Sequence, residues 1–168
     1  MIHLETDLVK IGRLGIKRED ENFRFRSFLK GKDDHKVDQL VHLINKEVES
    51  QIDCTLCGNC CKELTASVKD AEIDTLAAID QIPRELFITK YTDKNEFDSS
   101  LFLKDIPCKY LKDKKCSIYD SRPEDCRTFP NIYKKHFNSR LWGMVENYGI
   151  CPIVFNVMER LKVEFGFR

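Results

Sequence analysis

The chain has 168 residues, of which 42% are hydrophobic and 33% are charged. This balance is typical of a globular protein and excludes an intrinsically disordered chain. A chain of this length buries roughly 70% of its unfolded surface on folding, so it fits a single domain, residues 1–168, that does not need disulfide bonds. The 28 basic and 28 acidic residues cancel. We therefore expect no overall field that would attract nucleic acid or an anionic membrane.

The N-terminus and the apolar runs favour a cytoplasmic protein. The first residues, M-I-H-L-E-T-D, are acidic where a secretory signal has a basic region. The longest apolar stretches, such as Ile153 to Phe155, are far shorter than the roughly 18 residues of a membrane-spanning helix. In a reducing cytosol, cysteines remain thiols unless a metal holds them. This argument favours metal binding over disulfides for the eight cysteines of this chain.

Residues 1–33 predict an N-terminal helix or arm that packs on the domain. The apolar residues between Leu4 and Leu14 fit a short helix, whereas the phenylalanines between Phe23 and Phe28 fit an extended arm. A firmer pattern begins at Asp34, an acidic N-cap, and continues with apolar residues spaced by three and four up to residue 48. It predicts an amphipathic helix of about five turns that leads to the first cysteine.

Two more helices are predicted after the first cysteines. Ser67 and Asp70 form a capping box ahead of a short apolar pattern. Pro83 then precedes a helix over residues 84–91. Residues 97–103 have some strand character.

A small hairpin is predicted next, with residues 108–111 and 115–119 flanking the polar turn 112–114. The run Ser121-Arg122-Pro123-Glu124 predicts a second capping box, which would place Cys126 in the first turns of a helix where backbone amides favour a thiolate. Residues 153–165 predict a C-terminal helix. The fold class expected from these elements is α+β and mainly helical, a small single domain with a short β-hairpin and a cysteine-ligated metal site.

The densest chemistry lies in D-C-T-L-C-G-N-C-C-K, residues 53–62. Its CxxCxxC spacing is the one with which bacterial ferredoxins wrap three corners of an iron-sulfur cluster, and Gly58 allows the backbone to pass near a metal. Zinc more often uses two separated CxxC pairs. Neighbouring side chains diverge, so Cys60 and Cys61 are expected to serve different ions, or one of them to bridge or stay free. The predicted metal ligands are Cys54, Cys57, Cys60, Cys61, Cys108, Cys116, Cys126 and Cys151.

These residues resemble the YkgJ-type cysteine-cluster family, also described as a zinc- or iron-chelating domain. The resemblance is carried by the CxxCxxCC block, by Cys108, by C-S-I-Y-D-S-R-P-E-D-C-R from Cys116 to Arg127, and by Cys151-Pro152. It covers residues 50–155 and implies a domain that holds zinc or an iron-sulfur cluster. The family is also similar to flagellin lysine N-methylases, but this chain lacks a glycine-rich loop that would bind S-adenosylmethionine.

Three functions are compatible with the sequence. The first is a cytosolic cysteine-cluster protein with a structural, redox or accessory role, in which an iron-sulfur cluster is slightly favoured over zinc and a protein or redox partner is expected. The second is a metal-dependent enzyme, methylase-like or an oxidoreductase, with an open coordination position; its catalytic residues are unknown, although Asn59, Tyr119, Asp120 and Arg122 lie near predicted ligands. The third is a zinc-stabilised binding module, although zero net charge disfavours nucleic acid as its target. Lys62, Lys109 and Arg127 are candidates to offset thiolate charge.

Overall fold

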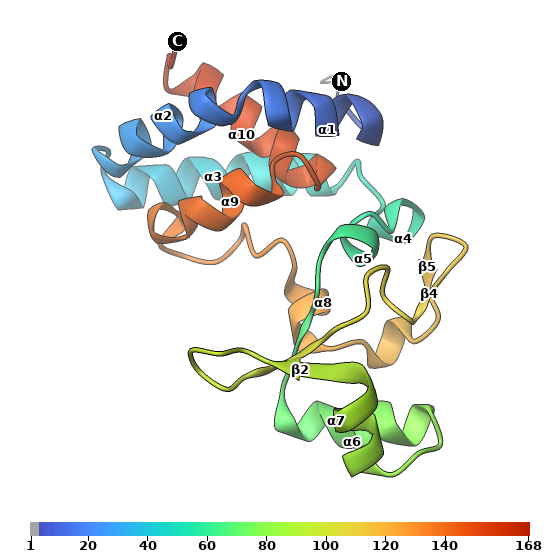
Figure 1. Cartoon of the computed structure of the whole chain (residues 1–168). Helices are drawn as coiled ribbons and strands as arrows, with labels where there is room; N and C mark the ends of the chain where they lie inside the picture. The colour runs from blue at the N-terminus through green and yellow to red at the C-terminus, as the bar shows by residue number, and fades with distance from the viewer. Residues whose placement is uncertain (1–3) are drawn as a thin grey trace. The chain divides into compact units, whose positions relative to one another are not determined.

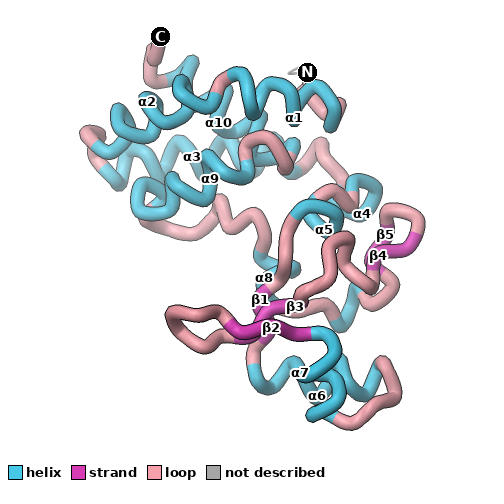
Figure 2. The backbone as a smooth tube through the Cα atoms, in the orientation of Figure 1, coloured by secondary structure: helices cyan, strands magenta, loops and turns pink. Residues whose placement is uncertain are grey.

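The computed structural model describes residues 4–168, and the chain divides into two compact units. Unit 1 consists of the chain up to Asp53 together with Pro130–Arg168, and unit 2 is Cys54–Phe129. Helices dominate the described residues and the strands are short and antiparallel (Figures 1 and 2), which confirms the predicted, mainly helical α+β class. A single domain over residues 1–168 stays a prediction. No helix within residues 4–168 combines the length and apolar composition needed to cross a bilayer.

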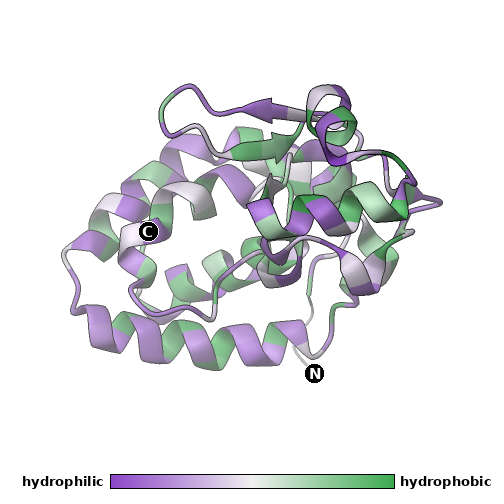
Figure 3. Ribbon diagram, turned by 90° about the horizontal axis from the view of Figure 1, so that it is seen from below, coloured by the Kyte–Doolittle hydropathy of each residue, from purple (hydrophilic) through white to green (hydrophobic). Residues whose placement is uncertain are grey.

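Unit 1 is a bundle of helices whose apolar faces pack together. In chain order the helices are α1 (Leu8–Lys17), α2 (Glu19–Lys30), α3 (Asp34–Glu49), the 3-10 helix η2 (Phe137–Arg140), α9 (Leu141–Asn147) and α10 (Pro152–Glu164). Helix α10 makes its main contacts with α3. Hydrophobic and hydrophilic residues alternate along the helices (Figure 3), and α3 buries one stripe, whereas residues 152–158 of α10 are buried on all sides.

The structure corrects the predicted N-terminal arm. Residues 23–28 are helical, because Phe25 and Leu29, four residues apart, share one face of α2 and are fully buried. The helix predicted from residue 34 is confirmed, but its N-cap is Asp33, whose carboxylate accepts a hydrogen bond from the Lys36 amide at 2.9 Å. The C-terminal helix is also confirmed. It begins at Pro152, with Cys151 at its N-cap.

Gly15 allows α1 to approach the turn that precedes Cys151. A Cβ atom at Gly15 would lie 2.6 Å from the Cα atom of Gly149, whereas one at Gly12 on the same helix would lie 3.8 Å from the carbonyl oxygen of Gly149. We expect Gly15→Ala to lower the free energy of unfolding by about 1–3 kcal/mol, because the two backbones must separate.

Gly12→Ala is the matched control for this prediction. It should raise the free energy of unfolding by about 0.5–1 kcal/mol, since alanine is the better helix former and meets no clash. Urea unfolding followed by circular dichroism measures both changes. Equal effects of the two substitutions would contradict the proposed close packing.

Unit 2 combines short helices with two small antiparallel sheets. Its elements are α4 (Cys54–Cys57), α5 (Cys60–Glu63), β1 (Ser67–Val68), α6 (Asp70–Ile79), α7 (Arg84–Tyr91), β2 (Thr92–Lys94), β3 (Leu101–Leu103), β4 (Leu111–Lys112), β5 (Lys115–Cys116), the 3-10 helix η1 (Tyr119–Ser121) and α8 (Glu124–Thr128). The first sheet has the order β1-β3-β2, with Ser67 opposite Phe102 and Thr92 opposite Leu103. The second is the hairpin β4-β5.

The core of unit 2 lies beside two of the downstream cysteines. Its buried residues are Val68, Ile73, Leu76, Ala77, Phe87, Leu103 and Tyr110. Cys108 and Cys116 are partly buried and pack against this group. Packing against a dense core fixes the directions of these two side chains, since core side chains have little freedom to move.

Two predicted capping boxes are wrong. Ser67 lies in strand β1, and the N-cap of α6 is Lys69, whose amide donates to the Glu72 carboxylate at 2.9 Å. Ser121 lies in η1, and α8 instead begins after Pro123. The strand predicted over residues 97–103 is shortened to β3, because the preceding residues form an exposed loop.

Candidate metal centre

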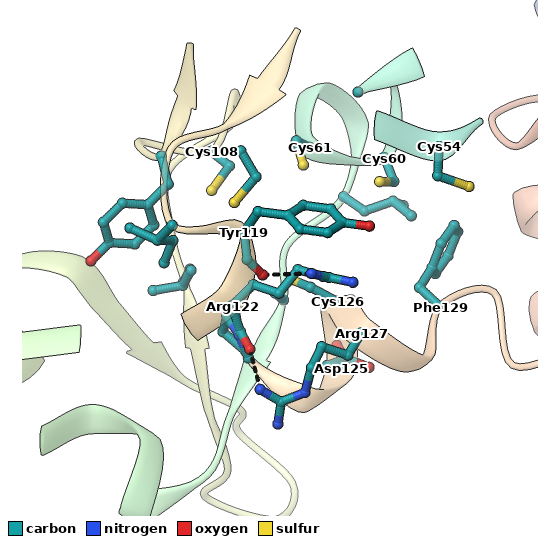
Figure 4. Close-up of a pocket in the computed structure, with 18 of the residues that line it drawn as sticks. Cys54, Cys60, Cys61, Cys108, Tyr119, Arg122, Asp125, Cys126, Arg127 and Phe129 are labelled. Carbon is teal, nitrogen blue, oxygen red and sulfur yellow. Dashed lines mark hydrogen bonds between the residues drawn. The ribbon is translucent and has the colours of Figure 1, made fainter. Parts of the chain in front are cut away.

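Six cysteines line one cavity of about 250 Å³ in unit 2 (Figure 4). They are Cys54, Cys60, Cys61, Cys108, Cys116 and Cys126. They come from four separate parts of the chain: the α4-α5 segment, the turn before β4, strand β5 and helix α8. Of the other two predicted ligands, Cys57 is half-buried at the end of α4 outside the cavity wall, and Cys151 is buried in unit 1. Folding thus brings together six of the eight predicted ligands, and the ligand role of each cysteine stays a prediction.

Gly58 separates the two helical turns that carry the first cysteines. Its φ angle is +60°, in the left-handed region, which ends α4 and lets the chain restart as α5 at Cys60. A Cβ atom here would lie 2.4 Å from the carbonyl oxygen of Lys114. The absence of a side chain therefore allows the β4-β5 turn to pack against the backbone between Cys57 and Cys60.

The hairpin places Cys116 in the cavity wall. Leu111 pairs with Cys116 and Lys112 with Lys115, and the turn residues Asp113 and Lys114 have φ angles of +47° and +66°. Two consecutive positive φ angles are typical of the turns whose twist suits a two-residue hairpin. The predicted hairpin is therefore confirmed, with the correction that Cys108 lies just before its first strand.

Cys108 is fixed by main-chain and side-chain contacts. Its amide donates to the carbonyl oxygen of Cys61 at 2.7 Å, which joins the second half of unit 2 to the first cysteine group. The next residue, Lys109, forms an ion pair with Asp80 and lies 3.2 Å from the centroid of the Tyr91 ring. The Tyr110 hydroxyl donates to the same Asp80 carboxylate at 3.1 Å. Lys109 is therefore engaged in holding this turn on α6 and α7.

Cys126 is positioned by polar contacts of the short helix α8. The Asp125 carboxylate accepts a hydrogen bond from the Ser67 amide at 2.9 Å, which ties α8 to strand β1. Glu72 of α6 accepts one from the Glu124 amide at 2.7 Å. These bonds explain why Ser67 and Ser121 do not cap helices. The amides of Ser67 and Glu124, which the two predicted capping boxes would use, bind carboxylates from other elements.

The thiols around the cavity perturb one another. The pKa of Cys61 is raised by a hydrogen bond with the Cys60 thiol, by burial and by the charge of Cys60, while Arg122 opposes the shift. Burial is the main cause of the raised pKa of Cys108 and of Cys116, and the nearby Cys61 raises both further. These thiols therefore keep their protons at neutral pH in the absence of a metal, and a metal must displace those protons to bind.

Two expectations about individual cysteines are corrected. Burial, followed by the charges of Cys61 and Cys108, raises the pKa of Cys126 to about 12, so the start of α8 does not favour a thiolate there. Desolvation outweighs the few amides of a helix only five residues long. Cys60 and Cys61 also do not diverge, because both line the cavity and their thiols share a hydrogen bond.

The donor set fits a thiolate-bound metal. Zinc and iron-sulfur clusters both take cysteine sulfur as ligand, and six cysteines share this cavity. Among residues 4–168, no three His, Cys, Asp or Glu side chains are already arranged to hold a metal ion together. The structure shows six cysteines around one cavity. Their side chains must move closer together when a metal binds.

Comparison with known proteins agrees with this chemistry. The family model CxxCxxCC, described as "Putative zinc- or iron-chelating domain", matches residues 53–146. The match includes all six cysteines of the cavity wall, and Cys151 lies beyond its end. No solved structure matches the chain. The match covers more than half of the chain, and six of the cysteines within it line one cavity. This protein therefore belongs to the CxxCxxCC family of zinc- or iron-chelating domains.

Proposed function

We propose that unit 2 holds a polynuclear, thiolate-bound metal centre, with an iron-sulfur cluster as the first candidate and zinc as the second. The observation that carries this proposal is the cavity, in which cysteines from four segments meet around about 250 Å³. One tetrahedral zinc ion uses four ligands. Six thiols exceed that need and are enough for a centre with more than one metal ion, such as an iron-sulfur cluster.

The centre would supply electron transfer or a covalent tie between the four segments. The chain's own residues shape the cavity for it. The aliphatic side chains of Leu64, Leu103 and Ile118 and the ring of Phe129 form an apolar part of the wall beside the cysteines. Apolar side chains beside a metal site lower the local dielectric constant and so strengthen the electrostatic interactions of a bound metal. We place the protein in the cytosol, where thiols stay reduced, with a protein or redox partner.

The test is anaerobic purification followed by elemental analysis and an absorption spectrum of the same sample. Iron with acid-labile sulfide and a broad band at about 400 nm would establish an iron-sulfur centre. Colourless protein with more than one zinc per chain would establish the second candidate. Protein that contains neither metal, and that binds neither after anaerobic reconstitution, would refute the proposal.

Catalysis at an open coordination position is the second candidate function. The cavity wall includes Tyr119, Arg122 and Asp125 in addition to the cysteines, so polar groups lie where a substrate could reach a bound metal. A ligand-exchange test separates the two functions. Cyanide or a small thiol that changes the spectrum of the loaded protein indicates an open position, whereas an unchanged spectrum indicates a closed one.

A further inference from the structure

Arg122 is a half-buried cation of the cavity wall. Its guanidinium carbon lies 3.5 Å from the centroid of the Tyr119 ring, and its Nη1 atom donates to the Tyr119 carbonyl oxygen (Figure 4). Within the described part of the chain, residues 4–168, no ion pair joins it to an acidic side chain. A half-buried cation without a counter-charge is costly, so its position calls for an anion nearby.

The other basic residues near the cysteines have an acidic partner, lie outside the wall or, like Lys114, line it but are exposed. Lys109 forms its ion pair with Asp80. Arg127 donates to the Arg122 carbonyl oxygen at 2.7 Å and lies 3.7 Å from the Glu72 carboxylate. Lys62 lies outside the set of cavity-lining residues in the described structure. The sequence suggests Lys62, Lys109 and Arg127 as counter-charges for the thiolates. None of them both lines the cavity and lacks an acidic partner among the described residues, as Arg122 does.

The surroundings of Arg122 hold it in place. The ring of Tyr119 covers one face of the guanidinium, and the hydrogen bond to the carbonyl oxygen fixes the direction of the planar group. Pro123, which is buried, follows it immediately and limits the backbone. Arg122 lines the same cavity as Cys61, Cys116 and Cys126, so its charge lies beside the predicted ligands.

We infer that Arg122 is the fixed counter-cation of the thiolate-metal centre and increases the affinity of the cavity for the metal. Four thiolates on a divalent ion leave two negative charges, and a cluster with cysteine ligands is likewise anionic. A cation that is held in place before the metal arrives stabilises this charge without further ordering. The inference rests on the proposed function, because it requires a thiolate-bound metal.

The test is a set of charge variants measured in anaerobic, metal-free protein. Co²⁺ is titrated in competition with a chelator, and the sulfur-to-metal absorption band reports binding through thiolates. Arg122→Gln should weaken Co²⁺ binding about 10- to 50-fold, the size expected for one charge a few ångströms away at a protein surface. Arg122→Lys should weaken binding less than Arg122→Gln does, because it keeps the charge but loses the planar group that stacks on Tyr119.

Lys62→Gln is the matched control, since it removes one positive charge next to Cys61 in the sequence from a residue outside the cavity wall. It should change Co²⁺ affinity by less than about threefold. A purely structural role of Arg122 predicts equal losses for the Lys and Gln variants together with a lower unfolding temperature of the metal-free protein, and that result would overturn the inference. Failure of the unaltered protein to bind Co²⁺ would instead refute the thiolate-metal centre itself.

Discussion

Gly58→Ala is expected to destabilise unit 2 by about 2–4 kcal/mol and to abolish stoichiometric metal binding. Two costs add at this position. Alanine tolerates a φ angle of +60° poorly, and its Cβ atom would lie 2.4 Å from the carbonyl oxygen of Lys114. Relief of the clash requires the β4-β5 turn to move, and Cys116 moves with it. Denaturant unfolding and anaerobic metal analysis of the same preparation measure the two effects.

Gly166→Ala separates the clash from the backbone strain. Its φ angle is +62°, almost the same as that of Gly58, but no heavy atom lies within 4 Å of the position of a Cβ atom. We expect this control to cost only about 1 kcal/mol and to leave the metal content unchanged. Metal content at the level of the unaltered protein in Gly58→Ala would show that the turn does not need to approach the first cysteine group.

Cys61→Ser should reduce the bound metal at least about tenfold under limiting metal, the largest effect expected of any single cysteine. Cys61 interacts with four of the other thiols of the cavity. Its thiol shares a hydrogen bond with the Cys60 thiol, and its charge raises the pKa of Cys108, Cys116 and Cys126. Serine keeps the size and the hydrogen-bonding capacity but loses the soft sulfur ligand. Elemental analysis after anaerobic purification gives the metal-to-protein ratio.

Cys57→Ser is the matched control, since it changes the same kind of side chain in the same motif. Cys57 is half-buried outside the cavity wall, so we expect this variant to keep most of its metal. Both variants should unfold within about 1 kcal/mol of the unaltered metal-free protein. A larger loss of metal in Cys57→Ser than in Cys61→Ser would mean that Cys57 is a ligand and that the loaded site uses a different set of cysteines from the one that lines the cavity.

The longer helices could be predicted from the sequence because their signals are local. The helix over residues 84–91 has the predicted bounds, and α10 begins at the proline that follows Cys151. Apolar residues at helical spacing and a proline in the first turn act over a few residues, so they survive in any tertiary context that buries the apolar face. The arm around Phe25 was misjudged, because its periodicity is weak until the packing partners are known.

The helix caps predicted at Ser67 and Ser121 are wrong, because distant residues bind the amides on which these caps depend. The Ser67 amide is bound by Asp125, and the Glu124 amide by Glu72, both more than 50 positions away in sequence. A cap read from sequence assumes that the local partner is the best one available. Here a carboxylate from another element competes with it, and the predicted serine caps are not used.

The candidate site, like the fold, can be predicted from the sequence only in part. The CxxCxxCC block and the motif from Cys116 to Arg127 are enough to indicate a soft-metal site, because thiol chemistry and close spacing are properties of the chain itself. Which of the cysteines line the cavity depends on folding. The bond from the Cys108 amide to Cys61 and the absence of a side chain at Gly58 bring distant cysteines to one place, and no sequence spacing encodes such contacts.

The protonation of Cys126 and the position of Arg122 likewise depend on tertiary structure. Burial depends on every neighbouring element, so it outweighs the local effect of a helix start on the pKa of Cys126. Arg122 is held in the cavity wall by the ring and the carbonyl oxygen of Tyr119, while Lys109 is held by Asp80. The sequence therefore specifies the kind of ligand that this protein offers to a metal, and the folded chain decides which ligands meet and which charge lies beside them, since both depend on contacts between distant residues.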